Sequence, residues 1–209
     1  MVSIVRAVQP LRLLDRRTFT ASGTWTKPTD YAGNIASGRG AVVRYKIVGG
    51  GAPGGATTFG ATSGYADGGE GGEVLRGEID IAQTAATETV TVAASVLSGA
   101  SANDSSFGAH AKAGGGRAVR SNLVGDTPLA NVTGGKRAGH GGWMNNNSNQ
   151  TQRGGPGCDG TGKGGDGQAN SGSAATGNAG AAPGGGGGAG TSAGGAGARG
   201  EVKIEVWGY

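Results

Sequence analysis

The residue types that carry most enzyme and metal chemistry are few in this sequence, and they are scattered along it. His110 and His140 stand far apart, with no carboxylate or cysteine at metal-ligand spacing beside them, and Cys158 is the only cysteine. Serine, aspartate and histidine all occur, but no nucleophile is visibly paired with a base. We therefore predict no catalytic residues, no metal and no cofactor, and we expect that the chain is not an enzyme.

Glycine-rich motifs that imitate nucleotide or calcium sites have little weight here. Gly155–Gly160 fits G-x-G-x-x-G, but with 49 glycines in the chain, chance alone gives roughly two such matches. Gly157–Lys163 approaches a P-loop, yet Gly164 stands where serine or threonine must hold magnesium. The same region imitates one calcium-binding nonapeptide, with Thr161 in place of the large apolar residue and without tandem copies. None of these motifs predicts a ligand.

The stretch Gly139–Arg153 is the most informative interruption of the glycine-rich sequence. Trp143 offers a flat apolar face with one N–H, and the neighbouring amides offer paired donors and acceptors, which suits sugars or exposed peptide. The alternative is a polar turn with Trp143 packed on the domain. A second aromatic interruption, with Phe59 and Tyr65, lies in Thr57–Asp67. Phe107 is expected to have a structural role. The candidate ligand-contacting residues are His140, Trp143, Met144, Asn145, Asn146, Asn147, Gln150, Phe59 and Tyr65.

Composition narrows the class of protein. Only 35% of the residues are hydrophobic and 5% aromatic, so a large apolar core is not expected and backbone hydrogen bonds must supply more of the order. The net charge of +4 comes from scattered basic residues, whereas nucleic-acid binding favours a dense stripe. No segment has the continuous apolar run of a signal peptide or a membrane span, and one cysteine cannot form an internal disulfide framework. We expect a protein made in a cytoplasm, without a membrane span or a nucleic-acid partner.

Alternating apolar residues predict a small set of β-strands. Val43, Tyr45 and Ile47 alternate with basic residues, which is the period of two expected for a half-buried strand. Similar composition or alternation recurs in four other places. The predicted strands lie in Thr18–Thr26, Ala41–Val48, Glu73–Ile81, Thr87–Val96 and Val202–Val206. The last strand is expected to close the sheet.

The region from Val96 to Gly200 has almost no apolar periodicity and is too long for an ordinary loop. Glycine recurs at every third residue in several runs within it. The runs are Gly154, Gly157 and Gly160, then Gly184, Gly187 and Gly190, then Gly194, Gly197 and Gly200. Three residues per turn is the period of a polyproline II helix, whose backbone groups point outward and can bond to neighbouring helices. We predict ordered, closely packed helices of this kind. A flexible linker is the alternative, although strands flank the region on both sides.

Several motifs in fixed order cover nearly all of the chain after residue 17. They are Phe19–Pro28, Val48–Gly51, Gly68–Glu73, Ser105–Gly108, Gly184–Gly188 and Gly200–Trp207. In these motifs the chain resembles the glycine-rich domains of phage tail fibre tips and adhesins. The opening from Phe19 to Pro28 is a more specific likeness than the glycine runs. The resemblance implies a small antiparallel β base carrying a bundle of polyglycine II helices, whose far loops contact the host receptor.

The residues and the resemblance together lead us to expect a mainly β and irregular fold with almost no α-helix. Residues 1–17 are expected to form an attachment arm, and residues 18–209 the glycine-rich domain. Within that domain we expect the β base at 18–96 and 201–209 and the polyglycine region at 97–200. A frayed terminus is the alternative for the arm. The residues expected to attach it to tail proteins or sister copies are Ile4, Val5, Val8, Leu11, Leu13 and Leu14.

The expected function is that of a tail protein of the virion, which attaches a phage to its host. The ligand-contacting residues named above then become receptor-binding residues, and the receptor is a glycan or a protein. A purely structural tail component without receptor contact is the alternative. A more remote class is an ice-binding polyglycine bundle, which would show thermal hysteresis. The other expected partners are phage tail proteins and further copies of the chain, with a trimer as the expected symmetry.

Overall fold

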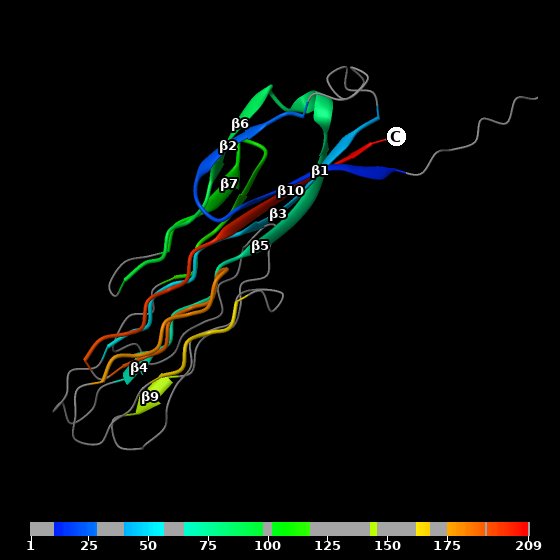
Figure 1. The fold of residues 1–209 in the computed structure, drawn as a ribbon. Coiled ribbons are helices and arrows are strands. Elements are labelled where there is room, and N and C mark those ends of the chain that lie inside the picture. The colour runs from blue at the N-terminus through cyan, green and yellow to red at the C-terminus, as the bar shows by residue number, and fades with distance from the viewer. Residues whose placement is uncertain are drawn as a thin grey trace, which may run out of the picture.

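The computed structural model describes residues 11–28, 40–56, 65–97, 102–117, 143–145, 162–167, 175–190 and 192–208. Over these residues the chain is mainly antiparallel β-sheet, with one short 3-10 helix, η1 (Ile81–Gln83), and no α-helix. The prediction of a β-rich fold with almost no α-helix is therefore confirmed. Within the same residues, no helix has the length and apolar character that crossing a membrane requires. Most strands gather at one end of an elongated molecule, and glycine-rich segments extend from them towards the other end (Figure 1).

The first sheet consists of four antiparallel strands. In spatial order they are β1 (Arg12–Phe19), β10 (Glu201–Gly208), β3 (Val42–Val48) and β5 (Val74–Asp80). β10 lies between β1 and β3, so the expectation that the last strand closes the sheet is not met. β1 begins at Arg12, which means that residues 12–17, assigned above to the arm, belong to an edge strand. A register shift between Leu13 and Asp15 interrupts that strand.

The second sheet also has four antiparallel strands. In spatial order they are β2 (Gly23–Thr26), β6 (Thr87–Thr91), β7 (Ser105–Phe107) and β8 (Ala111–Ala113). β7 and β8 fall within the range assigned above to the polyglycine region, because strands of three residues are too short to show an apolar period. A separate pair joins β4 (Tyr65–Asp67) to β9 (Trp143–Asn145).

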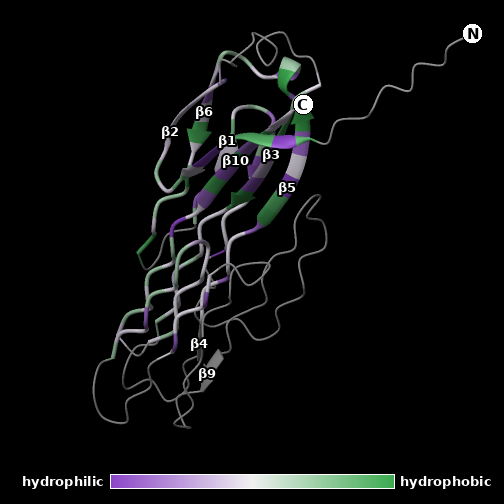
Figure 2. Cartoon of the chain, turned by 45° about the vertical axis from the view of Figure 1, so that its right-hand side comes forward, coloured by the Kyte–Doolittle hydropathy of each residue, from purple (hydrophilic) through white to green (hydrophobic). Residues whose placement is uncertain are grey.

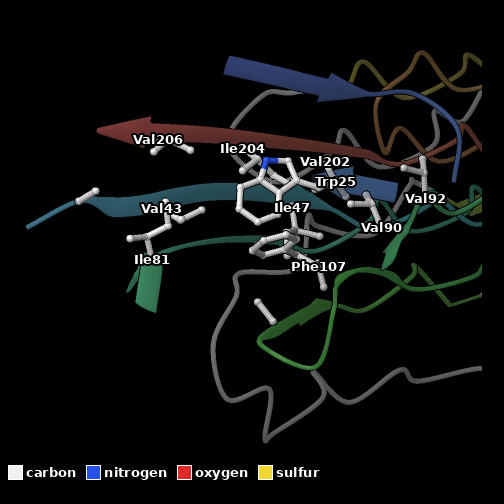
Figure 3. Packing of buried hydrophobic residues seen from close by; sticks show 13 residues of the cluster. Trp25, Val43, Ile47, Ile81, Val90, Val92, Phe107, Val202, Ile204 and Val206 are labelled. Carbon is white, nitrogen blue, oxygen red and sulfur yellow. The ribbon is translucent and has the colours of Figure 1, made fainter. Parts of the chain in front are cut away.

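The two four-stranded sheets face each other across one apolar core and form a β-sandwich (Figure 3). Alternate residues of β3 and β10 point into this core, where the register places Val202 opposite Ile47. Trp25 from β2 and Phe107 from β7 meet edge to face, with ring centroids 5.5 Å apart, a geometry that adds to the effect of area burial. Phe107 is fully buried, so its expected structural role is confirmed.

Non-strand segments run side by side away from the sandwich, and we call them the glycine bundle (Figure 1). They are residues 49–56, 68–73, 114–117, 162–167, 175–181, 184–190 and 192–200. The first two of these segments lie in the range assigned above to the β base, between strands. Figure 2 shows the bundle in pale colours of intermediate hydropathy, unlike the alternating green and purple of the strands. Backbone hydrogen bonds join the segments.

The buried segment 184–190 lies among several neighbours and bonds to them with a period of three residues. Gly185 and Gly188 donate to one neighbour and accept from a second, while Gly184 and Gly187 accept from a third. The bonds run from Gly185 to Ala181, Gly188 to Asn178, Ala198 to Gly185, Gly195 to Gly188, Gly72 to Gly184 and Gly69 to Gly187, at 2.7–3.0 Å. Successive residues thus point in different directions, which a β-strand with its period of two does not do.

Close approach of these backbones makes glycine necessary at particular positions. A Cβ at Gly187 would overlap with the carbonyl oxygen of Gly195, and a Cβ at Gly51 would overlap with that of Gly185. The requirement is local, because Ala189 of the same central segment is fully buried with its methyl group in place.

Two buried glutamates continue the three-residue register at the edge of the bundle. Glu73 Oε2 accepts from the backbone N–H of Gly114 at 2.6 Å, and Glu70 Oε2 accepts from that of Arg117 at 3.2 Å. Each glutamate is only 6% exposed. The two carboxylates therefore act as acceptors for the N–H groups of Gly114 and Arg117, at the two ends of segment 114–117.

Candidate functional site

The strand pair β4–β9 lies at the end of the molecule farthest from the sandwich in both views, and we call it the tip (Figures 1 and 2). Its register places Tyr65 opposite Asn145, Ala66 opposite Met144 and Asp67 opposite Trp143. The backbone thus brings together four predicted receptor-binding residues from two distant parts of the sequence: Tyr65, Trp143, Met144 and Asn145. The others, His140, Asn146, Asn147, Gln150 and Phe59, lie outside the described residues.

The glycine bundle positions β4, because the chain passes directly from Asp67 into segment 68–73. Within that segment, the N–H of Gly69 donates to Gly187 at 2.8 Å, and the carbonyl of Glu70 accepts from Ala52 at 2.8 Å. The segment is therefore bonded to two different neighbours immediately after the strand. A strand fixed in this way loses less conformational freedom on binding a ligand than a free loop does.

The predicted attachment residues lie at the opposite end of the molecule, in and beside β1. Leu11 is half-buried, Leu13 is 39% exposed, and Leu14 packs against the sandwich core. Leu13 pairs with Trp207 of β10, and the Arg44 guanidinium lies 5.3 Å from the centroid of that indole ring. Leu13 is therefore the most exposed of the three. Ile4, Val5 and Val8 lie outside the described residues.

A hydrogen-bonded acid and imidazole in the second sheet were missed by the sequence analysis. His110 Nε2 lies 2.9 Å from Glu88 Oε1, which also accepts from the N–H of Ala85 at 2.8 Å. The imidazole ring lies 5.5 Å from that of Phe107, so this pair fastens the β7–β8 turn to β6 and to the core. Glu88 and His110 are 22 residues apart and meet only through strand pairing, so no spacing in the sequence indicated them.

The environment of Glu88 favours its charged form. The hydrogen bond from His110 lowers the pKa of this carboxyl, burial opposes that effect, and the Ala85 N–H and the charge of Lys27 add to the lowering. Within the described ranges, no three His, Cys, Asp or Glu side chains gather where they could hold a metal ion.

A cleft of about 360 Å³ lies between β1 and β2, which are edge strands of the two sheets. Its lining residues are consecutive on each strand: Arg17, Thr18 and Phe19, then Thr24, Trp25 and Thr26. Arg17 is 65% exposed, and its Nε pairs with Asp15 Oδ2 at 3.2 Å. Residues 18–26 were expected to form a single strand, so a cleft between two strands was not predicted.

The structure thus offers two candidate binding features, the tip and a cleft in the sandwich. The tip combines residues that the sequence analysis selected, whereas the cleft between β1 and β2 combines residues that it did not select for binding. Comparison with known proteins does not assign the chain to a family: no protein-family model matches it, and no curated protein matches it in sequence.

Proposed function

We propose that the chain is a phage tail protein of the virion and that it binds the host receptor with its tip. The observation that carries this proposal is the pairing of β4 with β9, which joins Tyr65 to Trp143–Asn145 at the end farthest from the sandwich. Aromatic and amide residue types gathered on one strand pair suit recognition of sugars or exposed peptide. The proposed receptor is accordingly a glycan or a protein of the host surface.

The glycine bundle serves, in this proposal, as a rigid scaffold of polyglycine II helices. Two observations support that interpretation. Residues three apart in segment 184–190 form backbone hydrogen bonds with the same neighbouring segment. A Cβ at positions such as Gly187 would overlap with a neighbouring backbone. Three residues per turn and close approach of glycine backbones are the properties expected of such helices.

The opposite end of the molecule is the proposed attachment side. Leu13 is exposed beside Trp207 there, and the residues that precede β1 are the arm named above. Tail proteins and sister copies, in a trimer, are the proposed partners on this side. In this proposal the β1 end of the molecule attaches to the tail, and the tip binds the receptor.

The test of receptor binding is Trp143→Ala, with Trp207→Ala at the other end of the molecule as the matched control. A rigid aromatic anchor contributes about 2 kcal/mol or more, so Trp143→Ala is expected to weaken adsorption to host cells at least about tenfold. Trp207→Ala is expected to leave adsorption unchanged. Both purified variants are also melted, because a Trp143 that only packs would lower stability and reduce binding in proportion. Normal adsorption by a stable Trp143→Ala protein would move the receptor site elsewhere.

A purely structural tail component is the second candidate, because the hydrogen bonding of the bundle would serve a spacer as well as a scaffold. Deleting residues 139–153, which include β9, separates the two functions. Normal numbers of particles that no longer adsorb support receptor binding. Loss of particle assembly supports the structural function.

A further inference from the structure

The cleft between β1 and β2 has a property that the receptor proposal does not use, because it is bounded by two free strand edges. β1 is the outer strand of the first sheet and β2 the outer strand of the second, among the strands that the structure describes. The lining residues run consecutively along each strand, so the cleft follows the backbone edges as well as the side chains. A strand edge offers unpaired N–H and C=O groups to another chain.

Hydrogen-bond alternation identifies which groups of β2 face the cleft. The backbone N–H of Lys27 donates to the carbonyl of Ala86 at 2.9 Å, in the same register that pairs β2 with β6. Backbone groups in an antiparallel strand point to alternate sides. The backbone N–H and C=O groups of Trp25 therefore point the same way as those of Lys27, towards β6. The N–H and C=O groups of Thr24 and Thr26 therefore point to the free edge. Two residues of strand separate them by about 7 Å.

The same reasoning applies to β1 across the first sheet. Ile81 donates to Ala41 at 3.1 Å, which fixes the alternation in β3. The alternation can be followed through the register of β3 with β10 and then through that of β10 with β1. It shows that the backbone N–H and C=O groups of Arg17 and Phe19 point towards β10. Thr18 is left with its backbone groups at the free edge. The cleft is thus lined by free backbone groups from both strands.

Charge indicates what kind of chain fits this edge. Residues 12–27 contain four basic residues and one acidic residue. Arg17 is the basic residue among those that line the cleft, while Arg16 pairs with Glu205 of β10. The acidic residue, Asp15, pairs with Arg17 on the same strand. Basic side chains on an edge strand discourage pairing with a second basic edge, and they attract an acidic one.

We propose that the cleft between β1 and β2 binds an extended, acidic peptide segment of another protein, which adds as a strand to the free edge of β2. Backbone pairing with Thr24 and Thr26 supplies the affinity, and Arg17 selects acidic side chains. A glycan of the same charge lacks alternating N–H and C=O groups at strand spacing, so the edge favours a peptide. This inference depends neither on the receptor site nor on the interpretation of the bundle.

The experiment uses the full chain and the peptide acetyl-Glu-Val-Glu-Val-Glu-Val-amide as the probe, with binding measured by calorimetry. Two further peptides carry N-methyl groups at every second residue, in opposite phases. An added strand uses only alternate N–H groups, so one phase should bind like the parent and the other should lose about tenfold or more in affinity. Equal binding by both phases would overturn strand addition, as would no binding by the parent peptide.

Two variants locate the binding on the protein. Thr24→Pro removes an N–H that faces the free edge and leaves the pairing with β6 intact, so the fold should be retained while affinity falls. Arg17→Ala should weaken binding of the acidic peptide, whereas Arg44→Ala, an exposed arginine on the outer face of the sheet, should not. If both variants bind normally, the proposal is wrong. Self-association that Thr24→Pro abolishes would also overturn it, because a second copy would then be the occupant.

Discussion

Gly187→Ala is the change that tests the packing of the glycine bundle most directly. Gly187 donates its N–H to Ala52 at 2.8 Å and accepts from Gly69 at 2.8 Å, so this one residue ties two neighbouring segments to the central one. The added methyl group would overlap with the carbonyl oxygen of Gly195 in a third segment. Because the three atoms nearest to the added methyl group are all backbone atoms, no side chain can turn aside to make room.

The expected cost follows from these contacts. Overpacking of a close-packed site costs about 1–3 kcal/mol, and weakening the two hydrogen bonds adds about 0.5–1.5 kcal/mol for each. A loss of about 3 kcal/mol in a chain of this size lowers the melting temperature by about 6–12 °C. Gly187→Val, with a branched side chain, is expected to cost more. Circular dichroism melting and denaturant titration of the purified variants measure the change.

Gly23→Ala is the matched control, because the same methyl group at this exposed position of β2 would meet only the Phe19 ring, at an ordinary 3.7 Å. Its melting temperature should stay within about 1–2 °C of the wild type. Wild-type melting for both variants would refute the packing argument, and it would favour a loosely ordered glycine region. Equal losses in both variants would show a general cost of replacing glycine.

Three further perturbations test other parts of the structure. The lowered pKa of Glu88 means that folding favours the charged form of this carboxyl. The wild type should therefore be more stable than Glu88→Gln at pH values above the ordinary carboxyl pKa, and this advantage should shrink as the pH falls through the lowered pKa. Melts recorded from pH 7 to pH 3 measure the difference. Glu73→Ala should cost about 1–3 kcal/mol in urea unfolding, because the Gly114 N–H loses its acceptor, while Glu73→Gln keeps a carbonyl oxygen there and should cost less. Deleting residues 1–10 should retain the melting temperature and abolish incorporation into particles, whereas deleting residues 1–16 should also destabilise the fold, because it removes more than half of β1. Normal incorporation of the shorter deletion would exclude the arm as the anchor.

Strands with a buried face were the most predictable part of the fold. The alternation of Val43, Tyr45 and Ile47 placed β3 correctly to within one residue, and Val202, Ile204 and Val206 indicated β10 in the same way. Their position in the sheet was not predictable, because alternation reports which side of a strand is buried but not which strands are its neighbours.

β1 was missed for a physical reason that the register shows. Edge strands carry charge, and β1 contains Arg12, Asp15, Arg16 and Arg17 in eight residues. The shift between Leu13 and Asp15 also breaks the period of two, so the leucines resembled a separate apolar arm. The pair β4–β9 could be anticipated only as composition, because pairing between distant segments leaves no local signal.

The bundle and the sandwich depend on each other through the order of the chain. Segment 49–56 continues from β3, segment 68–73 leads into β5, and segment 192–200 leads into β10. Glycine loses more conformational entropy on ordering than any other residue, so a free glycine segment has a strong tendency to stay disordered. Apolar burial in the sandwich fixes one end of each segment and thereby lowers the entropy that its hydrogen bonds must offset. The tip continues directly into segment 68–73, so its position depends on the bundle and, through the bundle, on the core around Trp25 and Phe107 at the other end of the molecule.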